Sequence, residues 1–394
     1  MFLNATIKHN PKLIETALAL HRDGVIPPNC FVIDMEAVSH NASLIKRAAD
    51  ANGLALYFTT KQVGFNPLIA KCVVQAGIHK ALAVDASEAS VLSRNGIPIG
   101  HVGHLGQIPY HLIGPILSLE PEVVTVFSVA KAQQISEVAT HKGKNVRLLL
   151  RVASEGDFFF PGQAGGFGLQ SLRKEASAIL ELPGVQIAGV TSYPCLQFDE
   201  ALRVLRPTLN FQTILQAARM LQDELGIHIE QINAPGNTCV SSMALLAQMG
   251  ATHAEPGHAL TGTTYLHAHL DQPEKPAMVY VSEVSHLFGN KAYALGGGIY
   301  RRAKVNNALV GASPDKLVRT EIIPLDPTAI DYYALLRMPH EQAIRIGDTV
   351  IVASRAQIFV TRSYVAIVEG IQEGNPALAG VFDALGNPVD RIFG

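Results

Sequence analysis

Lys61 is the residue of this sequence best suited to covalent chemistry. It ends the short apolar run Leu56–Lys61, which reads as a buried parallel strand, and a polar loop with Gly and Pro follows over Gln62–Pro67. Burying an ammonium is costly, so a lysine at the carboxyl end of a barrel strand is partly neutral and can form a Schiff base with a carbonyl carbon. The alternative is a lysine whose stem packs while its head reaches solvent.

Two glycine-bearing turns later in the chain have the composition of an anion site. The first, Asn233–Thr238, follows an expected strand and precedes a helix expected near Ser241, and the second, Glu255–Gly262, follows the next expected strand. Glycine lets backbone N–H groups approach an anion at a helix start, and barrels often bind phosphate after strands seven and eight. The residues that these turns would contribute are Asn233, Gly236, Asn237, Thr238, Gly257 and His258.

A Schiff-base lysine and a phosphate site at one barrel mouth describe a pocket for pyridoxal phosphate. Glu255 is placed to pair with the ring nitrogen, keeping it protonated and making the ring a stronger electron sink; the alternative is a helix-cap or surface carboxylate. Two other functions stay open. One is a cofactor-free aldolase that uses Lys61 on a keto substrate, and the other is a non-catalytic carrier of pyridoxal phosphate, although such carriers are single barrels.

Further polar residues fall where expected strands end. His101 and His104 fall at the end of the third strand, and we expect them either to contact cofactor or substrate or to be hydrogen-bonded loop residues. Arg151, on the fifth, suits the cofactor O3′ or a substrate carboxylate, and Ser192 or Tyr193, after the sixth, suits the ring.

The histidines near the end of this region do not predict a metal site. His267 and His269 would share one face of a strand, with His253 and His258 nearby. No carboxylate or cysteine completes the set, so no metal is expected.

Eight apolar, β-rich runs recur along the chain, separated by segments with the 3.6-residue period of helices. This alternation predicts an α/β fold, a (β/α)8 TIM barrel; an open doubly wound sheet is the alternative, but no glycine fingerprint follows its first strand. The runs fall near 55–60, 80–84, 98–102, 122–127, 146–152, 185–191, 229–233 and 252–255. The helical segments include Leu68–Gly77, Ala86–Asn95, Ala130–His141, Gln170–Glu181 and Ala201–Leu225.

The chain beyond the barrel changes character after a linker at Asp271–Pro276. We expect an N-terminal helical extension over residues 1–30 with a helix at 10–23, the barrel over 31–270, and a mostly β domain over 271–394. A strand at 31–34 is expected to pair with that domain, because eight barrel strands are counted without it. Strands of the β domain are expected at Met278–Leu287, Lys291–Leu295, Leu317–Pro324, Thr349–Ala353 and Ile358–Val368.

The composition of the 394 residues fits a protein of the cytoplasm. It is 48% hydrophobic and 16% charged with a net charge of −2, so nothing predicts nucleic acid as a partner. The four cysteines lie far apart, which fits a reducing compartment. We expect no signal peptide and no membrane span.

Several motifs resemble the alanine racemase-like, fold type III pyridoxal phosphate enzymes over nearly the whole chain, and within them the YhfX-type branch. Thr60-Lys61 resembles the family's Schiff-base lysine, Glu255-Pro256-Gly257 its "EPG" turn, and Gly347–Val350 its "GD.V" turn. The motif residues also include Phe31–Asp34 with Asn41, Leu150–Val152, Gly166–Gly168 and Gly189–Ser192. The resemblance implies bound pyridoxal phosphate, an amino acid or amine substrate, and a homodimer with shared active sites.

The chain also departs from its relatives. Alanine racemases carry arginine where this chain has Glu255, whereas the family's decarboxylases carry glutamate there and an arginine at the position of His258. The racemases' second base is a tyrosine, for which Tyr293 or Tyr300 is the candidate here, and Tyr364 resembles a tyrosine that reaches the phosphate. The resemblance therefore implies a racemase, or an enzyme of the decarboxylase or aldolase type, in which Lys61 is the general base on one face.

Overall fold

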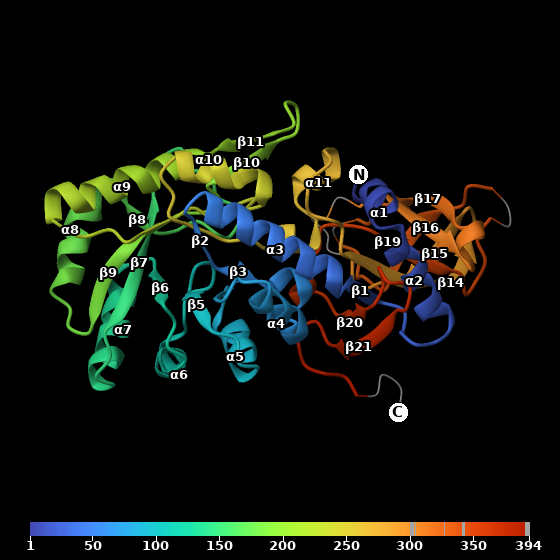
Figure 1. Ribbon diagram of the computed structural model, residues 1–394, viewed down its shortest axis with the longest axis horizontal. Coiled ribbons are helices and arrows are strands. Elements are labelled where there is room, and N and C mark those ends of the chain that lie inside the picture. Colours follow the sequence, from blue (N-terminus) through green and yellow to red (C-terminus); the bar gives the residue numbers. More distant parts are fainter. Residues whose placement is uncertain (300–302, 304, 327, 341–342, 391–394) are drawn as a thin grey trace. The chain divides into compact units, whose positions relative to one another are not determined.

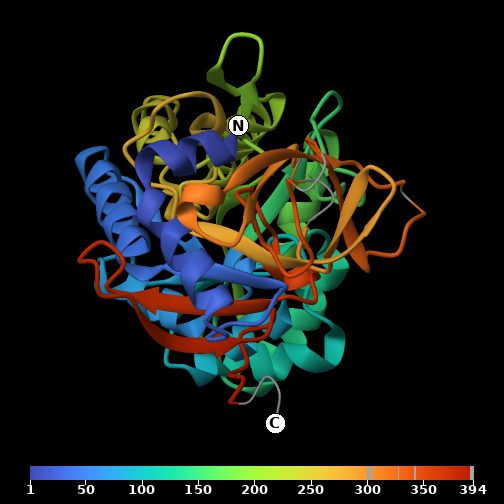
Figure 2. The same cartoon turned by 90° about the vertical axis from the view of Figure 1, so that its right-hand side faces the viewer.

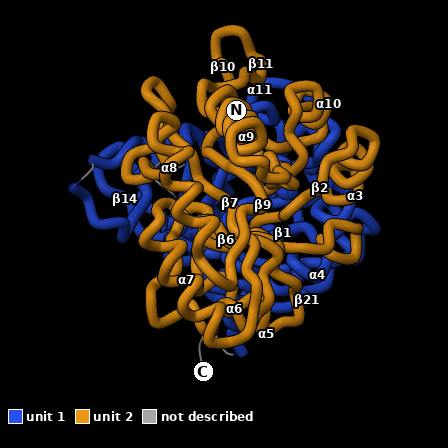
Figure 3. The backbone as a smooth tube through the Cα atoms, turned by 90° about the vertical axis from the view of Figure 1, so that its left-hand side faces the viewer, with its two compact units in different colours: residues 1–41, 61–72, 260–394 blue, residues 42–60, 73–259 orange. Residues whose placement is uncertain are grey.

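The computed structural model describes residues 1–390 except 300–302, 304, 327 and 341–342. The chain forms two compact units (Figure 3): unit 1 comprises residues 1–41, 61–72 and 260–394, and unit 2 comprises residues 42–60 and 73–259. Among the residues described, no helix is both long enough and apolar enough to cross a membrane.

Unit 2 is built on a closed barrel of parallel strands. The sheet runs in the order β2-β13-β12-β9-β7-β6-β5-β4-β3. Only Tyr57 separates β2 from β3, so these are two halves of one strand and the two ends of the sheet meet. Counted in this way the barrel has eight strands, and the predicted (β/α)8 fold is confirmed. The strands are β2 (Ala55–Leu56), β3 (Phe58–Thr59), β4 (Ala81–Ala83), β5 (Ile99–Val102), β6 (Val123–Val126), β7 (Val146–Ala153), β9 (Val185–Thr191), β12 (Gln231–Asn233) and β13 (His253–Ala254).

Helices of unit 2 lie around the outside of these strands (Figure 1). Apolar side chains from different strands meet on the inside, where Tyr57, Leu82, Val123, Leu149 and Ala188 form one buried cluster. The helices following the strands are α5 (Ala86–Arg94), α6 (Ile113–Ser118), α7 (Val129–His141), α8 (Leu169–Leu180), α9 (Leu209–Leu225) and α10 (Met243–Gln248); α3 (Met35–Ala51) and α4 (Pro67–Gln75) span the division between the units.

One predicted helix is wrong at its start. The segment expected to be helical over Ala201–Leu225 begins with a hairpin of β10 (Leu196–Asp199) and β11 (Val204–Pro207), and α9 starts only at Leu209. Pro207 is the physical reason, because a proline disfavours helical backbone in the residue before it and cannot donate a helical hydrogen bond.

Unit 1 contains a mostly antiparallel sheet of nine strands in the order β15-β18-β17-β16-β19-β14-β1-β20-β21. β15 also pairs with β14, which closes six of these strands into a small barrel and leaves β1, β20 and β21 as an extension (Figure 2). The strands are β1 (Cys30–Asp34), β14 (Met278–Phe288), β15 (Lys291–Leu295), β16 (Asn307–Gly311), β17 (Val318–Ile323), β18 (Tyr333–Arg337), β19 (Thr349–Val352), β20 (Tyr364–Glu369) and β21 (Ala377–Phe382).

The strand predicted near 31–34 does belong with the C-terminal strands, since β1 pairs antiparallel with β14 and parallel with β20. The helices α1 (Phe2–His9) and α2 (Pro11–Arg22) bury apolar side chains in the core that β1, β14 and β19 share. The single strand expected over Ile358–Val368 is wrong, because 358–360 form a short 3-10 helix and β20 begins at Tyr364. β16, β18 and β21 were not predicted.

Candidate active site

Glu255 lies at the carboxyl end of β13, where the barrel strands run out, and its side chain is only 3% exposed. β13 pairs with β2, and the backbone N–H of Thr59 donates to the carbonyl of Pro256 at 3.0 Å. The first and last strands of the barrel therefore end side by side. Glu255 is the first residue after β13, and Pro256 and Gly257 follow it, so the strand cannot continue beyond it.

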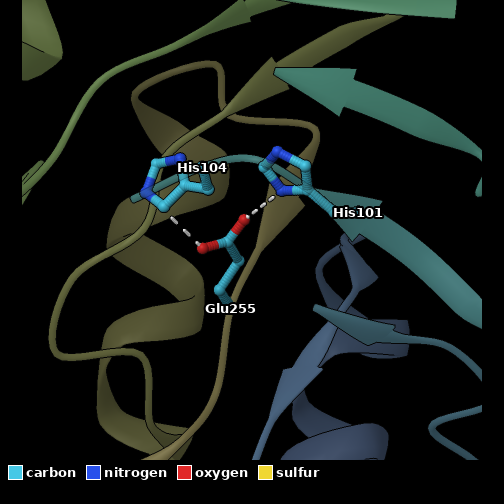
Figure 4. Close-up of side chains that lie close together, drawn as sticks. All are labelled: His101, His104 and Glu255. Atoms are coloured by element: carbon cyan, nitrogen blue, oxygen red, sulfur yellow. Dashed lines mark hydrogen bonds and ion pairs between the residues drawn. The ribbon is translucent and has the colours of Figure 1, made fainter. Parts of the chain in front are cut away.

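The two oxygens of Glu255 have different surroundings (Figure 4). Oε1 accepts hydrogen bonds from Asn233 Nδ2 at 2.6 Å and from His101 Nδ1 at 2.8 Å. Oε2 lies 3.9 Å from His104 Nε2, which is an ion-pair distance and not a hydrogen bond. The carboxylate is therefore held through one oxygen.

His101 is itself fixed at both ring nitrogens. It is the third residue of β5, its side chain is fully buried, and its Nε2 lies 2.5 Å from Thr125 Oγ1 on the neighbouring strand β6. The rings of His101 and His104 are in contact, with 5.3 Å between their centroids. The result is a buried line of polar groups across the barrel interior, from Thr125 through His101 to Glu255 and Asn233.

These contacts keep Glu255 ionised. Burial is the largest single influence and would raise the pKa of its carboxyl group. The charge of His104 and the hydrogen bonds and charge of His101, together with the bond from Asn233, outweigh it and bring the pKa to about 2. Because an ionised carboxylate can only accept, His101 Nδ1 must carry the proton that it donates.

Arg151 is a second buried charge in the barrel, on β7. Its Nη1 donates to the carbonyl of His104 at 3.1 Å and its Nη2 to that of Gln163 at 2.6 Å, and the guanidinium lies 4.7 Å from the centroid of the Phe127 ring. Burial lowers the pKa of Arg151 to about 10, so it stays charged at neutral pH. Arg151 thus fixes the loop that carries His104.

The first glycine turn packs tightly against another loop. Gly236 has φ +130°, and a Cβ there would stand 3.0 Å from the carbonyl oxygen of Leu196. Asn237 also has positive φ, and its Nδ2 donates to Leu196 O at 3.0 Å. The Asn237 amide therefore helps to hold this turn against the loop that carries Leu196.

Other predicted residues of unit 2 lie close to this cluster. The hydroxyl of Thr238 accepts from the backbone N–H of Glu255 at 3.4 Å. Ser192 is buried at the end of β9 and accepts from Asn210 Nδ2 at 3.2 Å, and Tyr193 presents its ring at right angles to His104. Gly257 and His258 continue directly from Glu255 and Pro256.

Lys61 lies two residues beyond the end of β3. The preceding residue, Thr60, is anchored to Glu88 of α5: its backbone N–H and its hydroxyl both donate to Glu88 Oε1, at 3.2 and 2.6 Å. Lys61 is half-buried and begins a short 3-10 helix, Lys61–Val63. Only Thr60 separates it from Thr59, the residue hydrogen-bonded to Pro256.

Comparison with known proteins gives the family. Residues 33–265 match the model of the alanine racemase N-terminal domain, and residues 279–378 match that of the YhfX-like C-terminal domain. YhfX of Escherichia coli strain K12, described as an uncharacterized protein, is 42% identical over 388 residues, covering 98% of this chain and 99% of that one.

The chain belongs to the alanine racemase-like family. Among solved structures, the alanine racemase of Clostridium difficile 630 superposes with a TM-score of 0.62 at 16% identity, covering 91% of this chain and 99% of that one. The diaminopimelate decarboxylase of M. jannaschi gives a TM-score of 0.65 at 14% identity, covering 94% and 93%. At such identities these neighbours show the fold, and this alanine racemase-like chain shares it with proteins named for different reactions.

The predicted tyrosines lie in unit 1 of this family member or outside the described residues. Tyr293, on β15, stacks on His286 with 4.4 Å between ring centroids, and Tyr333 meets the His286 ring edge-on. Tyr364 is the first residue of β20 and packs against the core of unit 1. Tyr300 lies outside the described residues. The roles of all three stay predictions.

The strand expected to carry His267 and His269 is wrong. His267 and His269 lie on the helix α11 (Tyr265–His269) and not on a strand. Thr264 precedes the first residue of this helix, and its Oγ1 lies 2.7 Å from His267 Nδ1, a contact that stabilises the helical turn. A different group could hold an ion: the ligating atoms of His101, His104 and Glu255 lie within 4.8 Å of one another.

Thr125 was not predicted, and neither were the bonds from His101 and Asn233 to Glu255. The available signal was the alternation of side chains along a strand, which turns His101 and Thr125 toward the barrel interior.

Proposed function

We propose that the protein is a pyridoxal phosphate-dependent enzyme that acts at the α-carbon of an amino acid or amine, with Lys61 as the covalent attachment point of the cofactor. The observation that carries the proposal is Glu255. A buried, ionised carboxylate held through one oxygen at the end of a barrel strand suits a protonated ring nitrogen. The strand beside it ends at Thr59, two residues before Lys61, and the chain belongs to a family of pyridoxal phosphate enzymes.

The residues of this chain fit the group. When bound, pyridoxal phosphate supplies an electron sink for negative charge at the α-carbon. Glu255 would hold the proton of the ring nitrogen, and the turns at Gly236 and Gly257 would hold the phosphate through backbone N–H groups. Lys61 would bind the cofactor's aldehyde carbon and, once exchanged for the substrate amine, would take or return a proton at the α-carbon.

The type of reaction depends on which group, if any, acts as an acid or base on the α-carbon from the face opposite Lys61. A racemase needs an acid or base on the face opposite Lys61, and Tyr293, with His286 stacked on its ring, is our candidate, supplied by the second protomer of a homodimer. Glu255 is equally compatible with loss of a carboxylate or an aldehyde fragment, because a carboxylate at the ring nitrogen supports full negative charge on the carbon. We therefore propose a racemase or a lyase of the decarboxylase or aldolase type.

The test is cofactor uptake by the purified full-length protein. We expect an absorbance band at roughly 420 nm after incubation with pyridoxal phosphate, the property of the cofactor imine. The band should disappear in Lys61→Ala and persist in the matched control Lys71→Ala, which changes an exposed lysine of α4. A wild-type protein without the band, or a band that survives Lys61→Ala, would overturn the proposal. Screens for racemisation, decarboxylation and aldehyde release then separate an enzyme from a carrier.

A further inference from the structure

Glu255 is surrounded by more hydrogen-bonding side chains than a carboxylate needs in order to pair with a ring nitrogen. Two donors share Oε1: the amide of Asn233 and the imidazole of His101. The further nitrogen of His101 contacts the Thr125 hydroxyl. All of these side chains are buried, and three different barrel strands supply Asn233, His101 and Thr125. Buried polar groups of this kind are costly unless they are satisfied, which points to a role beyond packing.

The arrangement divides the carboxylate into two unequal oxygens. Oε1 is occupied by two donors, and the remaining neighbour of Oε2 among the described residues is His104, at 3.9 Å. A ring N–H would therefore meet Oε2. The donors on Oε1 withdraw electron density from the whole carboxylate, which makes Glu255 a weaker base and leaves the shared proton on the ring nitrogen.

We propose that His101 is a positioning residue for the cofactor's ring nitrogen. It holds Oε1 together with Asn233, so that Oε2 receives the ring N–H, and Thr125 fixes the imidazole in the orientation that donates. The inference rests on the proposed function. It assigns His101 no contact with the cofactor or substrate; His101 acts through Glu255. Among the described residues, the titratable side chains near its ring include Glu255, His104 and Tyr57, the last with its ring centroid at 5.9 Å, and His253 lies behind Tyr57.

The test uses full-length protein loaded with pyridoxal phosphate that carries 15N in its ring, because the nitrogen chemical shift reports ring protonation directly. In wild type we expect a protonated nitrogen. In His101→Leu the shift should move toward the value of a neutral pyridine, and the dissociation constant for the cofactor should rise at least about tenfold, as expected for a lost hydrogen bond to a charged group.

His101→Asn is the conservative rescue, because an asparagine amide can occupy the place of Nδ1 and donate to Oε1. It should keep a protonated nitrogen and an affinity within about threefold of wild type, a difference well below the cost of a lost charged hydrogen bond. Thr125→Val should fall between wild type and His101→Leu, and it keeps the inference testable if His101→Leu does not fold. His79→Leu, at an exposed histidine before β4, is the matched control and should match wild type.

Failure of this inference is distinct from failure of the proposed function. If wild type takes up no cofactor, both fall. If wild type and His101→Leu bind the cofactor with the same nitrogen shift and affinity, Lys61 and Glu255 keep their proposed roles and His101 has none. Stoichiometric metal in purified wild type that disappears in His101→Leu would also overturn the inference, because His101, His104 and Glu255 would then be metal ligands.

Discussion

Replacing Glu255 by glutamine removes a buried charge while keeping the size of the side chain. Contacts in the folded protein lower the pKa of Glu255 from 4.5 to about 2, so the ionised group favours the folded state. The difference corresponds to about 3 kcal/mol of stability at neutral pH. That contribution is fully present above about pH 4.5 and is lost as the pH falls toward 2, since the unfolded chain takes up the proton first.

The Glu255→Gln variant lacks this contribution at every pH. We therefore expect its free energy of unfolding to lie below that of wild type at pH 7, and the gap to narrow by about 2 kcal/mol between pH 7 and pH 3. Carboxylates away from this cluster titrate equally in both proteins and cancel in the comparison.

Urea denaturation of the cofactor-free proteins at pH 7, 5, 4 and 3 measures this gap. Circular dichroism is the suitable signal, because the chain contains no tryptophan. A gap that stays constant over this range would refute the account of Glu255 as an ionised group held by His101, His104 and Asn233. A gap that widens toward acid would mean that the carboxyl group is protonated in the folded protein.

Three further substitutions test the surrounding structure. Gly236→Ala should lower the free energy of unfolding, measured by urea denaturation, by about 1–3 kcal/mol and should weaken cofactor binding. The reason is that a φ of +130° strains any side chain and the added Cβ would meet a carbonyl oxygen. Gly226→Ala, with open space around its Cβ, is the control and should keep cofactor affinity. Arg151→Lys should lower stability by about 2 kcal/mol, since an ammonium cannot replace both hydrogen bonds of the guanidinium; unchanged denaturation would contradict this. Thr60→Val removes the hydroxyl that anchors the end of β3 to Glu88 and should lower the free energy of unfolding by about 1–3 kcal/mol. A cofactor affinity equal to that of wild type would show that this anchor does not position Lys61.

Much of the barrel could be predicted from the sequence because buried parallel strands read as short apolar runs. All eight runs coincide with observed strands, from Ala55 to Ala254. The hairpin at 196–207 could not be predicted in this way. Its second strand, Val204–Pro207, is short and mostly exposed, and its mixture of Leu, Val and Arg also suits the start of the following helix. Only Pro207 argues against a helix there. The strands β16, β18 and β21 were missed for different reasons: β18 and β21 keep several half-buried or exposed residues and so lack a continuous apolar run, whereas β16 is a mostly buried run of five residues that was not recognised in the sequence.

The site was predictable one strand end at a time, but its contacts were not. The sequence places Glu255 after one strand and His101 on another, 154 residues away. Which strand ends meet across the interior depends on the closure of the barrel, and no local pattern encodes it. For the same reason the contact of Thr125 could not be predicted: strand alternation turns this side chain inward, but an inward-facing threonine is ordinary until the neighbouring imidazole is known.

Borohydride reduction followed by peptide mass spectrometry tests the central claim most directly. Protein incubated with pyridoxal phosphate and reduced should carry one pyridoxyl phosphate group per chain on the peptide that contains Lys61. Modification of a different lysine, or none at this peptide, would contradict the assignment of Lys61 and with it the proposed function.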